Sequence, residues 1–114
     1  MDTGLDYKIL NKQELKKLKY QLRSLVYRAV KQYKKSGNIM KSEIADKYNI
    51  DLAAIIERLK PFPTDPDMQI DHIEPLSSFN LSNPKVIKYA LGYWNFQWLG
   101  SSENKSKGKF PPIY

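Results

Sequence analysis

The chain has 114 residues, of which 41% are hydrophobic and 27% charged, a balance typical of one globular domain and not of a disordered segment. It contains no cysteine and one histidine, which excludes a disulfide framework, a cysteine-ligated zinc site and an all-histidine zinc site. The formal net charge of +7 favours an anionic partner.

The N-terminal sequence MDTGLDYKIL lacks the basic and then apolar run of a signal peptide. No stretch approaches the roughly 18 apolar residues of a membrane span. We therefore expect a soluble, intracellular protein without a membrane partner.

The positive charge is concentrated in the first half of the chain. Residues 1–60 contain 14 Lys or Arg and 7 Asp or Glu, whereas residues 61–114 contain 5 of each kind. Within the first half, residues 11–35 carry nine basic side chains and a single acidic one. One segment therefore carries most of the positive field.

This basic segment is predicted to form a long helix. Apolar side chains recur at spacings of three and four from Leu15 to Tyr33, Asn11 with Glu14 makes a start signal, and Gly37 a stop. Beside the apolar stripe we expect a basic stripe with the same spacing, formed by Lys12, Lys16, Lys19 and Arg23. The stripe suits phosphate binding; the alternative is a solvated face that only aids solubility.

Residues 40–60 predict two short helices, with Ser42 and Asp51 as their N-terminal caps. A DNA-reading helix-turn-helix is one interpretation of this pair. Packing support is the interpretation we prefer, because the second helix offers few basic side chains, namely Arg58 and Lys60.

The second half begins with residues 61–67, where three prolines in seven residues predict a linker. The pattern then predicts a strand, a helix, a strand and a short helix, at residues 68–73, 84–93, 95–99 and 102–107. Aromatic residues alternate along the second strand, which favours the core over base stacking for Trp94, Phe96 and Trp98.

Three segments of the second half occur in a meaningful order: DHIEPLSSF, then NFQWL, then ENKSKG. Together they resemble the HNH nuclease family and its ββα-metal motif. The pattern of that family runs roughly as Asp-His-Ile-x-Pro-Leu-Ser, then Asn-x-Gln-x-Leu, then Asn-x-x-Lys-Gly. The resemblance covers about residues 69–109, a third of the chain.

The resemblance implies an α+β fold in which N-terminal helices pack with a C-terminal ββα-metal motif. The whole chain, residues 1–114, would then be a single endonuclease domain. Its basic helical part would occupy residues 11–60 and its nuclease motif residues 67–109.

The resemblance also assigns roles, residue by residue. His72 matches the general base and Asp71 a metal ligand. Asn95 matches the middle Asn, which in the family steadies the loop that orients the histidine, and Asn104 matches a second metal ligand. The implied cofactor is Mg²⁺, Mn²⁺ or another divalent cation. Structural zinc is not expected, because the Cys-x-x-Cys pairs of many members have no counterpart here.

These residue types suit the implied chemistry. Hydrolysis of a phosphodiester needs a deprotonated water in line with the leaving oxygen and a cation that offsets the growing charge. A neutral imidazole accepts the proton of the water near physiological pH. Asp and Asn supply the oxygen ligands that Mg²⁺ or Mn²⁺ prefers.

Two geometric expectations follow from these roles. Asp71 and Asn104 must bring their side-chain oxygens within about 4 to 5 Å of each other to share a cation. Asn95 should bond to the backbone of the loop after His72 instead of entering the site. Neighbours on a regular strand face opposite sides, so Asp71 and His72 can serve one site only where the strand ends or bulges.

We therefore expect a metal-dependent DNA endonuclease of phage or mobile-element type, located in the cytoplasm of a bacterial or phage-infected cell. The alternative is a DNA-binding module that does not cut, and a membrane-surface role for the basic helix is a weaker third option. The residues expected to contact DNA are Lys12, Lys16, Lys19, Arg23, Lys105 and Lys107.

Overall fold

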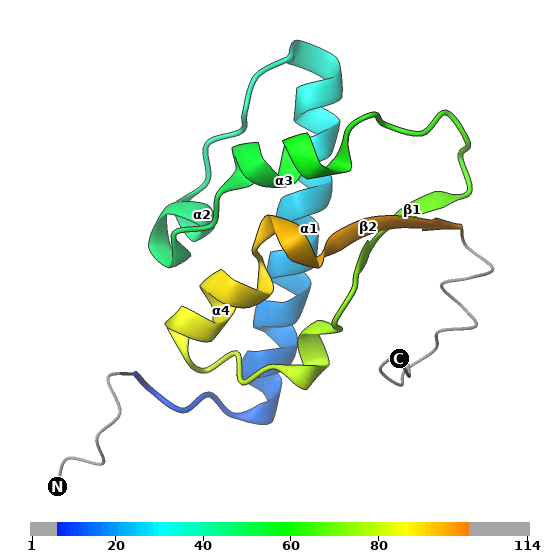
Figure 1. The fold of residues 1–114 in the computed structure, drawn as a ribbon. Coiled ribbons are helices and arrows are strands. Elements are labelled where there is room, and N and C mark those ends of the chain that lie inside the picture. The colour runs from blue at the N-terminus through cyan, green and yellow to red at the C-terminus, as the bar shows by residue number, and fades with distance from the viewer. Residues whose placement is uncertain (1–6, 101–114) are drawn as a thin grey trace, which may run out of the picture.

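The computed structural model describes residues 7–100 and shows an α+β fold of four helices and one two-stranded antiparallel sheet (Figure 1). The two strands lie in the second half of the chain, and α4 lies in the segment that joins them. In chain order the elements are α1 (Lys12–Ser36), α2 (Glu43–Tyr48), α3 (Leu52–Leu59), β1 (Met68–His72), the short 3-10 turn η1 (Leu76–Ser78), α4 (Pro84–Ala90), the 3-10 turn η2 (Tyr93–Asn95) and β2 (Phe96–Gly100).

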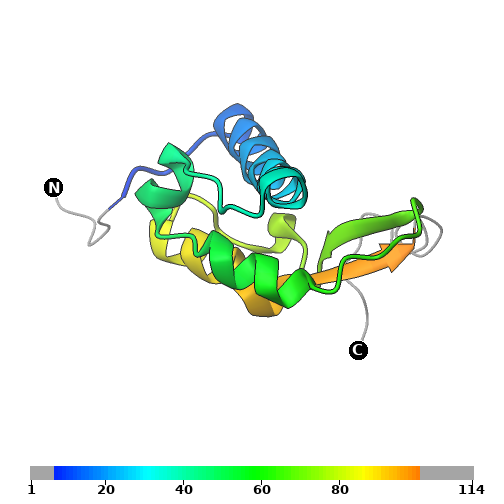
Figure 2. The same ribbon diagram turned by 90° about the horizontal axis from the view of Figure 1, so that it is seen from above.

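The helix α1 forms a layer of its own, and the other elements lie on one side of it (Figure 2). Its inner face contacts α2 and α3, and α3 in turn contacts β2 and η2. No other element of residues 7–100 lies on the opposite side of α1. Among the described residues, no helix has both the length and the apolar content that crossing a membrane requires.

Both ends of α1 confirm the predicted signals. The Asn11 side chain accepts a bond from the Glu14 N–H, and the Glu14 carboxylate accepts one from the Asn11 N–H, so the capping box is complete. At the other end Gly37 has a φ of 73°, a left-handed conformation that favours glycine. The helix therefore begins and ends where its sequence indicates.

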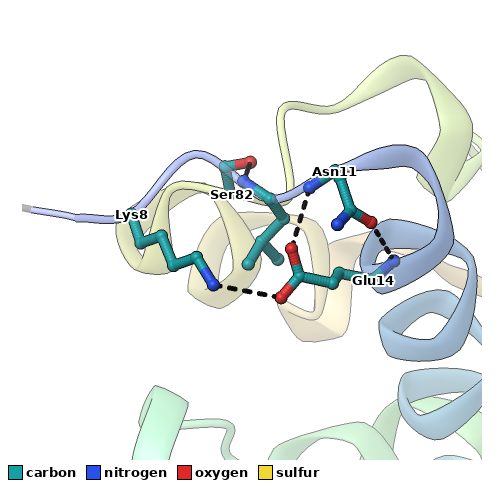
Figure 3. A network of polar contacts seen from close by, with 5 residues as sticks. Lys8, Asn11, Glu14 and Ser82 are labelled. Carbon is teal, nitrogen blue, oxygen red and sulfur yellow. Dashed lines mark hydrogen bonds and ion pairs between the residues drawn. The ribbon is translucent and has the colours of Figure 1, made fainter.

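A polar network holds the start of α1 against the loop before α4 (Figure 3). Lys8 Nζ lies 3.2 Å from a Glu14 carboxylate oxygen, and the Leu10 N–H donates to the Ser82 hydroxyl at 2.9 Å. Ser82 is buried, and it is 72 residues from Leu10 in sequence. This contact joins the two halves of the chain.

The core lies between α1 and the layer of the other helices. α3 buries its whole apolar face there, as its spacing predicts, and Arg58 on the same helix donates from Nε to the Phe96 carbonyl oxygen at 3.2 Å. Arg58 and Lys60 both bond within the chain, as packing support predicts, and both side chains are exposed. The largest fully buried apolar side chains are Leu22, Leu25, Val26, Ile55, Ile56, Leu59, Leu76, Ile87, Leu91 and Phe96.

An aromatic cluster fastens the linker and the sheet to the end of α1. The Phe62 ring packs edge-on against Tyr33 and Trp98, with centroids 5.9 and 6.4 Å apart. Trp98 Nε1 donates to the Leu59 carbonyl oxygen at 2.7 Å, and Lys34 Nζ lies 5.3 Å from the Phe62 ring centre. Lys34 therefore contributes to packing although it belongs to the basic segment.

The helix α4 is shorter than its sequence pattern predicts, ending at Ala90 instead of residue 93. Trp94 folds back, its Nε1 donating to the Tyr89 carbonyl oxygen at 3.0 Å. A Cβ at Gly92 would lie 2.8 Å from the Trp94 side chain, so only glycine leaves room for this turn. Trp94 thus packs against the Tyr89 ring and not in the core, contrary to the expectation for this residue.

Candidate active site

The candidate site lies where β1 ends and the loop of residues 73–79 begins. The two strands are paired one to one over five residues, ending with His72 opposite Phe96, and no bulge interrupts these pairs in the described sheet. One further backbone bond follows, from the Ile73 N–H to the Asn95 carbonyl oxygen at 2.9 Å. β1 thus ends at His72, one residue earlier than predicted.

The loop after His72 turns sharply and folds onto the core. Pro75 has no N–H with which to continue the ladder. Its carbonyl oxygen accepts bonds from both the N–H and the hydroxyl of Ser78, at 2.9 and 2.7 Å. The next side chain, Leu76, is buried. The loop is therefore fixed at its start and cannot extend the strand.

His72 is half-buried at this strand end. Its ring lies against the Phe96 ring, with centroids 4.8 Å apart and planes tilted by 49°. Nε2 of the imidazole is enclosed by protein. Because Phe96 is itself fully buried, the contact fixes the imidazole at the edge of the core.

Asp71 is also half-buried, and its carboxylate is held from the neighbouring strand. Gln97, its direct partner across the sheet, donates from Nε2 to Asp71 Oδ2 at 3.0 Å. A carboxylate has about four acceptor positions, so this bond is compatible with further ligation. The sequence did not predict this role of Gln97, because it depends on the register of two strands that are distant in sequence. The available signal was the position of Gln97 in the Asn-x-Gln pattern of NFQWL.

Asp71 and His72 contact opposite faces of the hairpin. The carboxylate bonds to Gln97, whereas the imidazole packs against Phe96, the next residue toward the core. This alternation is what a regular strand imposes. Asp71 and His72 were expected to serve one site only where the strand ends or bulges. The strand does end at His72, but Asp71 remains inside the paired region.

The Asn95 side chain is buried beside the site and bonds to backbone groups. It is 0% exposed; its Oδ1 accepts from the Glu74 N–H at 2.6 Å, and its Nδ2 donates to the carbonyl oxygens of Glu74 and Ala90 at 3.0 and 2.9 Å. Glu74 is two residues after His72. The expectation that Asn95 bonds to the backbone of the loop after the histidine is confirmed.

Three of the predicted site residues lie outside the described residues: Asn104, Lys105 and Lys107. The expected approach of Asp71 to Asn104, and the short helix at residues 102–107, therefore remain predictions. Within residues 7–100, no group of three or more His, Cys, Asp or Glu side chains is placed to hold a metal ion.

The oxygen chemistry of Asp71 nevertheless fits a hard divalent cation. Such ions take few protein ligands, retain water and accept the remaining oxygens from a phosphate. Asp71 offers a carboxylate oxygen from a paired strand, and the neutral amide of Gln97 donates to that carboxylate. The described residues thus fit part of a Mg²⁺ or Mn²⁺ site.

The basic row predicted on α1 is a surface feature. Lys12, Lys16 and Arg23 are exposed, and Lys19 is partly exposed. The buried row runs beside them, from Leu18 to Val30. The structure thus brings Asp71, His72 and Asn95 together around one strand end, with the basic row on a different element.

In comparisons with protein-family models, with curated proteins and with solved structures, nothing matches this chain.

Proposed function

We propose that the protein is a metal-dependent DNA endonuclease of the HNH type, with His72 as the general base. The observation that supports this most strongly is the bonding of Asn95. Its buried amide bonds to both the N–H and the carbonyl of Glu74, and so holds the loop that follows the histidine. This is the role that the resemblance assigns to the middle Asn of the motif.

His72 would take a proton from the attacking water. An effective base needs a fixed ring, a fixed tautomer and an ordinary pKa near neutrality. The contact with Phe96 fixes the ring, and Nε2 is the enclosed nitrogen, so we assign the base to Nδ1. The enclosed Nε2 would keep the remaining proton.

Asp71 and Asn104 would hold the divalent cation, which when bound would offset the charge that develops on the phosphate oxygens. Gln97 would orient the Asp71 carboxylate through the bond at 3.0 Å. In an in-line displacement the attacking and leaving oxygens lie on opposite sides of phosphorus. A base and a metal ligand must therefore approach one phosphate from its two sides, which His72 and Asp71 would do only around the strand end at His72.

The basic row of α1 would hold the DNA through its phosphates. Contacts of this kind position a duplex without reading its sequence. Lys105 and Lys107 would add contacts next to the metal ligand Asn104.

The alternative is a DNA-binding protein that does not cut, and one observation favours it. Asp71 and His72 contact opposite faces of the hairpin, so a site that needs both on the same face is not assembled in this structure. Such a protein would use the basic row and leave the phosphodiester bonds intact.

Incubation of the purified protein with supercoiled plasmid distinguishes the two functions. The nuclease converts the plasmid to nicked or linear DNA in Mg²⁺ or Mn²⁺, and excess chelator stops the conversion. Binding without conversion in either metal would reject the nuclease and leave the non-cutting protein. A protein that neither binds the plasmid nor converts it would reject both functions.

A further inference from the structure

Two tyrosines on the outer face of α1 are exposed. Tyr20 is 73% exposed and Tyr27 is 51% exposed, in the middle of a helix whose inner face is buried. They are seven residues apart, two turns of the helix, so they lie on the same face about 10 Å apart along the axis. Figure 2 shows that the other described elements lie on one side of α1.

Cations flank both rings. On a helix the neighbours of a side chain are three and four residues away. Those positions hold Lys16 before Tyr20 and Lys31 after Tyr27, and Arg23 lies between the two tyrosines. All three cations are exposed. The outer face is therefore a row of alternating cations and aromatic rings: Lys16, Tyr20, Arg23, Tyr27 and Lys31.

No packing within the described part of the chain accounts for these rings. Two other tyrosines do have ring partners: Tyr33 packs against Phe62, and Tyr89 against Trp94. Among residues 7–100, neither Tyr20 nor Tyr27 contacts another ring or lies under a cation. Their aromatic surface is thus available to a ligand.

We propose that this alternating row binds a DNA strand whose bases are accessible, with the cations on phosphates and each tyrosine stacked on a base. The proposal rests on the proposed function in taking DNA as the ligand, but it does not require cleavage. Phosphate contacts alone need no aromatic ring, whereas stacking needs an unpaired base. Bases within a stack are 3.4 Å apart. Rings about 10 Å apart must therefore take separate bases.

The preference has a physical reason. In a duplex the base faces are covered by their neighbours, so an exposed ring reaches only groove edges and sugars. In an unpaired strand every base offers a face, and stacking is tolerant of sequence. The row should therefore strengthen binding to single-stranded or locally opened DNA more than binding to a closed duplex.

The test measures the affinity of the full chain for a fluorescent 20-nucleotide oligothymidine and for a 20-base-pair duplex, with chelator present so that no strand is cut. The variant Tyr20→Leu with Tyr27→Leu removes both rings but keeps apolar side chains suited to a helix. We expect it to bind the single strand at least about tenfold more weakly, because stacking is worth about 1 to 3 kcal/mol per base. Its affinity for the duplex should change less than twofold.

Two control variants separate the rings from the charges. Tyr20→Phe with Tyr27→Phe keeps the rings and should bind the single strand within about twofold of the wild type. Arg23→Gln should weaken binding to both DNAs, since it removes a phosphate-binding cation.

Equal losses on the two DNAs, or no loss on the single strand, would overturn the stacking row. The proposed nuclease function would still stand in that case, provided that the wild type cuts plasmid in the metal-dependent assay. A wild type that binds neither oligonucleotide would overturn both proposals.

Discussion

Asn95 is a polar residue inside the core, and its side chain satisfies three backbone groups at once. Two of these belong to Glu74, in the loop after His72, and the third to Ala90 at the end of α4. An amide is needed, because only an amide both donates and accepts in this arrangement. The residue therefore links the loop, α4 and β2.

Replacing Asn95 by Asp should destabilise the fold by about 2 to 4 kcal/mol, since a buried carboxylate cannot donate to two carbonyl oxygens. Urea unfolding at neutral pH measures the loss. Asn83→Ala is the matched control, because Asn83 caps α4 at the surface and its loss should cost only about 1 kcal/mol. Equal losses for the two variants would show that the Asn95 bonds do not hold the loop.

At the scale of single elements, the N-terminal cap of α1 depends on Glu14, the acidic residue of the capping box. Its bond from the Asn11 N–H and its bond from Lys8 lower the pKa of the carboxyl below the ordinary 4.5. A lowered pKa in the folded state means that the ionised carboxylate contributes stability above pH 4.5. That contribution is lost as the pH falls through the folded pKa.

The free energy of unfolding of Glu14→Ala should accordingly be lower than that of the wild type at pH 7, and the gap should narrow as the pH falls below about 4.5. Urea titrations at several pH values measure it. Lys8→Ala keeps the capping box, so its free energy of unfolding at pH 7 should be closer to that of the wild type than the value for Glu14→Ala is. A gap independent of pH would show that the charge of Glu14 has no part in the cap.

The second prediction at this scale concerns DNA binding by the basic row of α1. Replacing Lys12, Lys16, Lys19 and Arg23 by Gln should weaken binding to duplexes of any sequence. It should also make the affinity less dependent on salt. The slope of the logarithm of the binding constant against the logarithm of the salt concentration should become shallower by about 0.9 for each phosphate that the variant no longer neutralises.

A matched control removes four exposed lysines outside α1 and so lowers the net charge equally: Lys41, Lys47, Lys85 and Lys88. This control should retain most of the salt slope. Equal flattening by both variants would assign the effect to net charge and not to the row.

At the scale of the whole molecule, local signals predicted the helices and most of their ends. The start and stop of α1, the caps of α2 and α3 and the burial of Phe96 agree with the sequence pattern. The end of α4 does not, because it depends on Trp94 folding back over Gly92 onto Tyr89. Such a contact is tertiary and has no signature in helical periodicity.

The candidate site divides in the same way. The bonding of Asn95 agrees with the role that the motif assigns to it. The bond from Gln97 to Asp71 depends on strand register, which local sequence does not specify. The relation of Asp71 to Asn104 remains a prediction.

Cleavage by His72 variants tests the proposed chemistry most directly. Supercoiled plasmid is incubated in Mn²⁺ with wild type, His72→Ala or His72→Gln, and DNA binding and unfolding are measured on the same preparations. A general base contributes about 10² to 10⁴ in rate, so both variants should cut at least about 100-fold more slowly while binding DNA as well as the wild type. Cleavage by folded His72→Gln at the wild-type rate would contradict the assignment of His72 as the base and, with it, the proposed HNH mechanism.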